Sequence, residues 1–126
     1  MRFIRELIML ILIIVFVVII DNITQNITEK SLSKISIKIS QVEENLYSEN
    51  NKNKMNELSE SWKDIEAKLA FYMEHNELEQ ISSKMTNAKI SIEKNDTDEA
   101  IFYLDEIKFR VEHIKNKQKL ELKNIF

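Results

Sequence analysis

Apolar residues fill the start of the chain without interruption from Leu7 to Ile20. As a helix rising about 1.5 Å per residue, this run spans roughly 21 Å, or about 27 Å when Phe3, Ile4 and the stem of Arg5 are included. That length suits one short membrane crossing. We predict a transmembrane signal-anchor helix over residues 1–22, embedded through Leu7, Ile8, Leu10, Ile11, Leu12, Ile13, Ile14, Val15, Phe16, Val17, Val18, Ile19 and Ile20.

A secretory signal that is later removed has the same basic start and apolar middle. Its cleavage site needs small residues, whereas this run ends in large aliphatic residues and Asp21. That ending favours a retained anchor. Arg2 and Arg5 precede the run, so the positive-inside rule places the N-terminus in the cytoplasm and the rest of the chain outside the cell membrane.

Beyond the anchor, residues 23–126 show apolar positions at helical spacing, which predicts an extracytoplasmic helical bundle. The first helix continues outward to a polar corner at Ser48–Asn53. Alternation within "SKISIKIS" would also suit a strand, but one isolated strand has no partner in the chain. The apolar series of this helix is Ile23, Ile27, Ile35, Ile39, Val42 and Leu46, with Ser31 in its gap.

Three further helices follow the corner. The first carries an apolar seam with steps of three and four residues, typical of bundles. Asn76 and Glu79 have the spacing of a capping box that opens the next helix, and Asp96 and Glu99 repeat it before the last. The predicted core residues are Leu58, Trp62, Ile65, Leu69, Tyr72, Leu78, Ile81, Met85, Leu104, Ile107 and Val111.

The composition supports an all-α fold. The chain contains no Gly and no Pro, the residues on which most tight turns of sheet proteins depend. Helices joined by short Asn- and Asp-rich corners need neither, and short corners make neighbouring helices antiparallel. We predict one up-down antiparallel bundle of about four helices, with the anchor helix leading into the first.

Charge and cysteine content exclude several functions. The net charge is -3 and the charges are mixed along the chain, so a nucleic-acid partner is not expected. The chain has no cysteine, which excludes disulfides, thiolate metal sites and a cysteine nucleophile. Serines are plentiful, but a chain without glycine cannot form the usual nucleophile elbow or a phosphate-binding loop.

Several segments together carry a family resemblance: "SW" at Ser61, "FYMEHNELEQI", "DEAIFYLDEIKF", "EHI" and the ending "LELKNIF". Their order and spacing resemble small Firmicute proteins, mostly clostridial, catalogued as domain of unknown function 4363. The likeness covers nearly the whole chain and implies no activity. It implies a subunit of a membrane complex, because members of this family tend to be encoded beside small multispanning membrane proteins.

Both histidines are expected at the same end of the bundle. Imidazole and carboxylate groups suit Zn or Fe, which makes His75, Glu74, Glu77 and His113 the candidate metal ligands. The inward Glu-x-x-His motif of bundle metal sites is missing, however. The alternative is that these histidines make hydrogen bonds at helix ends. We therefore expect no metal, cofactor or catalytic residue.

The up-down order turns that same end, with the C-terminal tail, toward the membrane. Lysines and apolar residues alternate in the tail, a pattern that suits lipid headgroups or a transmembrane partner. A solvated helix end with its apolar residues tucked back under the bundle is the alternative. The expected contacts to the membrane or to a partner are His75, His113, Lys119, Leu122, Ile125 and Phe126.

Three functions remain open at this point. The leading hypothesis is a non-enzymatic accessory or assembly subunit of a membrane protein complex, bound to the membrane and to an integral membrane protein. The second is an extracytoplasmic sensor or ligand-binding domain, since clefts between helices hold small ligands. The third is a metal-dependent enzyme that uses His75 and His113. The anchor helix would also permit a homodimer.

Overall fold

The computed structural model describes the backbone of residues 1–125 and the side chains of residues 1–120. Four α-helices and no strands occur in residues 1–125, which confirms the predicted all-α fold. The helices are α1 (Arg2–Glu44), α2 (Asn51–Leu69), α3 (His75–Glu93) and α4 (Thr97–Ile125). The segment "SKISIKIS" is helical and not a strand.

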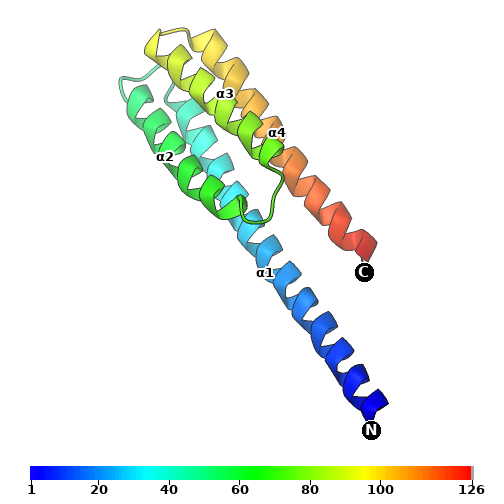
Figure 1. Cartoon of the computed structure of the whole chain (residues 1–126). Coiled ribbons are helices and arrows are strands. Elements are labelled where there is room, and N and C mark those ends of the chain that lie inside the picture. The colour runs from blue at the N-terminus through cyan, green and yellow to red at the C-terminus, as the bar shows by residue number, and fades with distance from the viewer. Residues whose placement is uncertain (126) are drawn as a thin grey trace.

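The four helices form an up-down bundle in which each helix packs against the next and α4 returns to α1 (Figure 1). Only the second half of α1 belongs to the bundle. Its first half projects from one end as a single helix, and α4 ends on that same side. The predicted boundary between residues 22 and 23 falls inside α1, which crosses it without a break.

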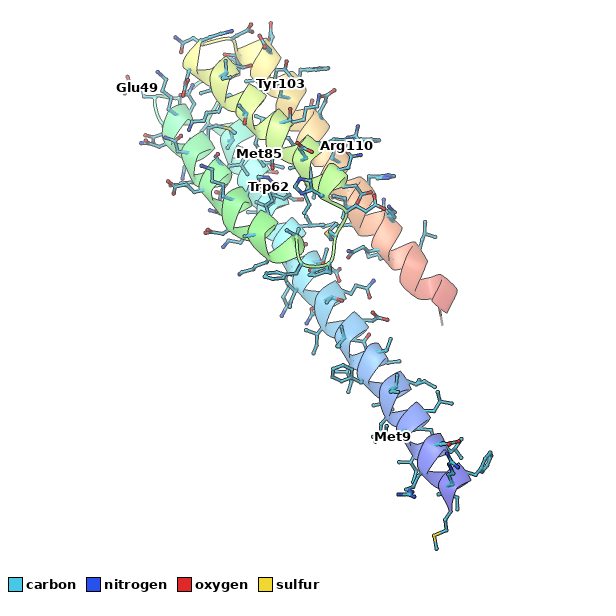
Figure 2. All side chains as sticks on the ribbon, viewed as in Figure 1. Met9, Glu49, Trp62, Met85, Tyr103 and Arg110 are labelled. Carbon is cyan, nitrogen blue, oxygen red and sulfur yellow. The ribbon has the colours of Figure 1, made fainter. Side chains whose placement is uncertain are left out.

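The core is one continuous cluster built from all four helices. Every predicted core residue except Tyr72 is buried, as are Met55, Ala88, Ile92, Ala100 and Ile114. The indole of Trp62 lies inside the bundle (Figure 2), and its Nε1–H donates a hydrogen bond to Ser82 Oγ at 2.8 Å. This bond satisfies the one polar group that burial of the ring would otherwise strand.

The predicted core-facing side of α1 is wrong in the part that follows the apolar run. Ile23 and Ile27 are exposed, and Thr28 and Leu32 are buried in their place. Steps of three and seven residues back from the buried Ile35 lead to Leu32 and Thr28, whereas steps of four lead to the flank of the helix. The chain offers both apolar series, and the position of the neighbouring helices selects the first.

An asparagine replaces the usual glycine at the corner between α3 and α4. The last turn of α3 ends at Asn95, whose φ of 61° lies in the left-handed region. The next residue, Asp96, donates its backbone N–H to Ser91 O at 2.9 Å, which closes the helix end. Asparagine tolerates this conformation better than other residues with a Cβ, so the corner forms without glycine.

The two predicted capping boxes have different outcomes. Asp96 Oδ1 accepts a hydrogen bond from Glu99 N at 3.1 Å, which confirms a cap at the start of α4. The predicted box of Asn76 and Glu79 is wrong, because α3 begins one residue earlier, at His75, after an extended Glu74. Asn76 therefore lies within the helix, and no side chain caps this end.

Leu104→Ala tests the core. Leu104 is fully buried, so truncation should lower the free energy of unfolding by about 2 to 5 kcal/mol through lost burial and a cavity. Ile37→Ala is the control, because Ile37 is exposed on α1. Denaturant unfolding of the full chain in detergent, followed by circular dichroism, measures both. Equal effects of the two variants would contradict the packing described here.

Asp96→Ala tests the cap. Loss of the Asp96 side chain should destabilise the protein by about 1 kcal/mol, because the Glu99 N–H loses its acceptor. Asn76→Ala should have no such effect, since Asn76 caps nothing. The same unfolding experiment compares them, and a larger loss for Asn76→Ala would show that the α3 start is wrongly described.

Candidate functional site

The base of the bundle is the end at which α1 leaves it. It contains the corner between α2 and α3, residues 70–74, together with residues 21–29 of α1 and the end of α4 from residue 113 onward. This region holds the residues that the sequence marks as candidate contacts to a membrane or a partner. Its geometry therefore decides which of them act together.

A cluster of hydroxyl groups ties the α2–α3 corner to α1. The side chains of Tyr72 and Thr28 are hydrogen-bonded to each other. Both also lie within hydrogen-bond distance of Thr24 O, at 2.7 Å for Thr28 Oγ1 and 3.3 Å for Tyr72. Tyr72 was predicted as core but is 39% exposed. Its ring does not pack in the apolar seam, because its hydroxyl is hydrogen-bonded to polar groups on α1.

A hydrogen bond from a side chain of α1 to the backbone of α4 joins the two helices at the base. Gln25 Nε2 donates a hydrogen bond to Gln118 O at 3.2 Å. The crevice beside this bond holds only about 10 Å³, enough for a single water molecule and no ligand. The residues that line it are Gln25, Thr28, Glu29, Lys115, Gln118 and Lys119.

The two histidines lie at the same end of the bundle, one at the start of α3 and the other on α4. Two ion pairs join α3 to α4, Lys117 with Glu77 at 3.1 Å and Lys84 with Glu106 at 2.8 Å. If paired residues lie opposite each other, His113 is level with a residue between positions 77 and 81, which is roughly 3 to 9 Å along the helix axis from His75. Both side chains are exposed, and the His113 ring stacks on Phe109 with 6.5 Å between ring centroids.

The candidate metal ligands do not form a ligand set. Glu74 and His75 are exposed at the start of α3, and the Glu77 carboxylate is paired with Lys117. Among the described residues, no group of three or more His, Asp or Glu side chains is placed to hold an ion.

An exposed apolar stripe on α4 was missed by the sequence reasoning. Phe102, Phe109, His113 and Leu120 are separated by seven, four and seven residues, and we call them the α4 outer stripe. Phe102, Phe109 and Leu120 are 57%, 69% and 61% exposed. The signal was present in the sequence, because these positions share one face of the helix, opposite the core series. Phe71, in the corner at the base, is 90% exposed.

The remaining predicted contact residues belong to the C-terminal tail. Lys119 is exposed on α4 beside the crevice. The helix backbone continues to Ile125, but the side chains of Leu122 and Ile125 and the whole of Phe126 lie outside the described residues.

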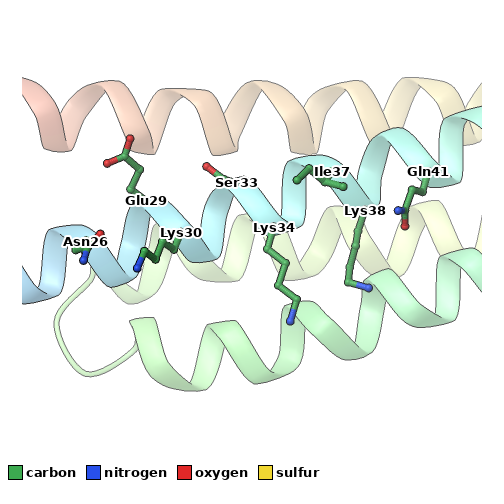
Figure 3. A pocket seen from close by; sticks show the side chains of 8 residues that line it. All are labelled: Asn26, Glu29, Lys30, Ser33, Lys34, Ile37, Lys38 and Gln41. Atoms are coloured by element: carbon green, nitrogen blue, oxygen red, sulfur yellow. The ribbon is translucent and has the colours of Figure 1, made fainter.

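A surface depression of about 680 Å³ lies on the outside of α1 and is lined by α1 alone. Figure 3 shows the Lys34 and Lys38 side chains reaching from it toward α2. A surface that one helix provides is an open shelf and not an enclosed cavity. Its lining residues are Asn26, Glu29, Lys30, Ser33, Lys34, Ile37, Lys38 and Gln41.

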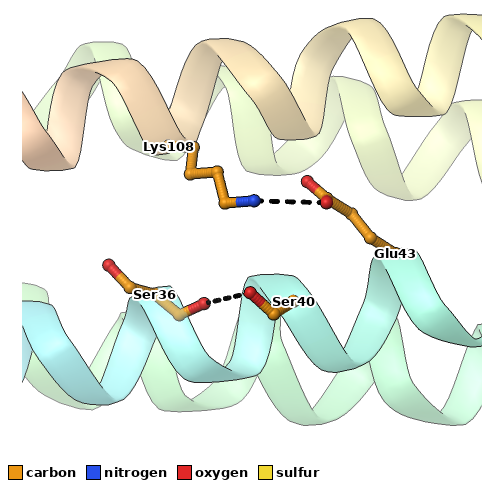
Figure 4. A network of polar contacts seen from close by, with 4 residues as sticks. All are labelled: Ser36, Ser40, Glu43 and Lys108. Atoms are coloured by element: carbon orange, nitrogen blue, oxygen red, sulfur yellow. Dashed lines mark hydrogen bonds and ion pairs between the residues drawn. The ribbon is translucent and has the colours of Figure 1, made fainter.

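Polar side chains join α1 to α4 higher in the bundle (Figure 4). Lys108 Nζ on α4 lies 3.2 Å from Glu43 Oε2 on α1, and Ser40 Oγ donates to Ser36 O at 3.2 Å. The ion pair closes the seam between the first and last helices. These contacts position α4 and contain no catalytic arrangement.

A known family profile matches most of the chain. The sequence profile of a domain of unknown function, DUF4363, matches residues 21–125. The chain belongs to the DUF4363 family. The match covers the whole bundle and begins at the end of the apolar run, so the residues before it lie outside the DUF4363 domain. Searches of curated proteins and of solved structures found no match.

Tyr72→Phe tests the hydroxyl cluster. Removal of the Tyr72 hydroxyl should lower the free energy of unfolding by about 1 kcal/mol, the net value of one hydrogen bond. Tyr47→Phe is the matched control, because Tyr47 is 84% exposed at the other end of the bundle. Equal stability of both variants, measured by denaturant unfolding, would show that this cluster does not hold the corner to α1.

Proposed function

We propose that this protein is a single-pass, membrane-anchored helical bundle that serves as an accessory or assembly subunit of a membrane protein complex. Its body lies outside the cytoplasmic membrane and catalyses no reaction. The observation that carries the proposal is the single helix α1, which is apolar and unpacked in its first half and part of the bundle in its second.

Hydrocarbon is the solvent that suits the first half of α1. By length and composition, α1 is the one helix of the described residues suited to cross a membrane, and none of its most apolar residues is buried inside the protein. In water, this continuous apolar surface would carry a large unfavourable free energy. In a bilayer the same surface is solvated, and the helix satisfies its own backbone groups.

The proposed orientation follows from the flanking charges. Arg2 and Arg5 lie before the apolar run, and Asp21 follows it. Positive charge stays preferentially in the cytoplasm, so the bundle lies on the outer side. Because α1 has no break, the base of the bundle stands directly above the bilayer.

The α4 outer stripe is the proposed contact for an integral membrane protein. Aromatic residues are enriched in protein interfaces, and Phe102 and Phe109 are mostly exposed in the isolated chain. The stripe spans roughly 27 Å along α4 and ends near the base. A neighbouring protein in the same membrane can therefore reach its aromatic part, Phe102 and Phe109, above the bilayer.

The alternatives find less support in the described residues. A ligand-binding ectodomain needs an enclosed cleft, whereas the crevice at the base holds one water and the depression on α1 is open. A metal-dependent enzyme needs convergent ligands, and the described residues contain no group of three or more His, Asp or Glu side chains placed to hold an ion.

Photocrosslinking in intact membranes tests the proposal. Benzoylphenylalanine in place of Phe109 should crosslink to an integral membrane protein, because Phe109 lies in the α4 outer stripe. The same residue in place of Tyr47 is the control, since Tyr47 is 84% exposed, against 69% for Phe109, but lies at the far end of the bundle. Mass spectrometry identifies the adducts.

Two results would overturn the proposed function. One is recovery of only uncrosslinked chain from position 109 in native membranes. The other is release of the full chain from membranes by alkaline carbonate, which removes peripheral proteins and leaves anchored ones.

A further inference from the structure

The base of the bundle lies level with the end of the apolar run. Gln25, which binds Gln118 of α4, is five residues beyond Ile20, or roughly 7.5 Å along α1. Past Gln118, α4 continues antiparallel to α1 as far as Ile125. Its last two turns therefore run back toward the start of the bilayer, at the depth of lipid headgroups.

The charge of this segment is opposite to that of the whole chain. Residues 114–126 contain four lysines and one acidic residue, Glu121, so their side chains carry a charge of four minus one, or +3, while the chain carries -3. Acidic residues gather instead at the opposite end of the bundle, around Glu49 and Asp96–Glu99. Within the base, Asp21, Glu29 and Glu74 balance this charge, so the positive charge is confined to the α4 side, and that side favours an anionic surface.

Lys115 and Lys119 are the lysines best placed to use that surface. They are one helical turn apart and both line the crevice beside Gln25 and Gln118. Lys117, between them, is directed to Glu77 on α3. Among the side chains described, no carboxylate lies within 4.0 Å of either Lys115 or Lys119, although Glu29 lines the same crevice.

Exposed apolar side chains lie at the same end of the bundle as these lysines. Phe71 is 90% and Leu120 61% exposed, and Ile23 and Ile27 are exposed on the flank of α1. Aromatic and aliphatic residues beside lysines are typical of protein surfaces that rest in the membrane interface. Water is a poor environment for Phe71, and the acyl boundary of a bilayer is a good one.

We propose that the base of the bundle binds anionic phospholipid, with Lys115 and Lys119 against the headgroup phosphate and with Phe71 and Leu120 inserted beside it. The proposal rests on the membrane anchor proposed above. The anchor holds the shallow site permanently at headgroup depth, so a weak interaction is enough to fill it. Phosphate recognition then fixes the tilt of the bundle on the membrane.

The test uses the full chain with Asn116→Cys, an exposed position on α4, as the only thiol. A fluorophore that responds to polarity is attached to this thiol, and the protein is reconstituted into vesicles. Vesicles with phosphatidylglycerol should shift the emission to shorter wavelength, and pure phosphatidylcholine vesicles should not. The shift should fall at least about fivefold with Lys115→Gln and Lys119→Gln together, since each lysine near an anionic surface contributes severalfold in affinity.

The matched control is Lys52→Gln with Lys94→Gln, which removes the same charge from the far end of the bundle and should leave the shift unchanged. An equal loss in this control, or equal emission in both kinds of vesicle, would overturn the lipid site. An equal shift produced by inorganic phosphate in detergent would also overturn it, because the site would then bind free phosphate.

Flotation of the vesicles separates this proposal from the proposed anchor. If the labelled chain floats with both kinds of vesicle, the anchor holds and the emission alone decides the lipid site. If it floats with neither, the anchor fails and the lipid proposal falls with it.

Discussion

Helix α1 passes from a surface that is apolar on every side to one that is apolar on a single side, with no break in its backbone. The rest of the structure depends on this continuity. A helix of 43 residues cannot bury its first half within a chain of this size, so that half is left outside the protein core. The second half supplies the template on which α2, α3 and α4 pack, which places the base of the bundle next to the unpacked segment.

The core was predictable because burial repeats along the chain. Each helix carries a series with steps of three and four, and residues such as Trp62, Met85 and Leu104 lie on it and are buried. The prediction failed where one helix carries two possible core-facing series, and where a hydrogen bond determines the position of a side chain. Ile27 and Thr28 belong to competing series on α1, and Tyr72 leaves its seam because its hydroxyl reaches Thr28. Tertiary contacts settle both cases, and a single sequence does not show them.

The sequence predicts which end of the bundle carries the candidate contact residues, but not which side chains are exposed there. Antiparallel order placed His75, His113 and the basic tail at one end, which follows from topology alone. In the part of the chain that the structure describes, no group of three or more His, Asp or Glu side chains is placed to hold an ion. Phe71, Phe109 and Leu120 are more than half exposed, and the proposed contacts depend on them. Histidine is rare in this sequence and therefore suggests a site, whereas the exposed apolar residues are common types that differ from core residues only in the face of the helix they occupy.

The unbroken α1 also fixes the rotation of the bundle relative to the apolar segment. Each residue of an α-helix turns the chain by about 100° and advances it by about 1.5 Å. One residue inserted between Ile20 and Thr28 would therefore rotate the bundle by more than a quarter turn about the axis of α1, relative to the apolar first half, and shift it by only about 1.5 Å. The direction that α4 faces relative to the apolar segment is thus set by the number of residues in this stretch and not by their identity.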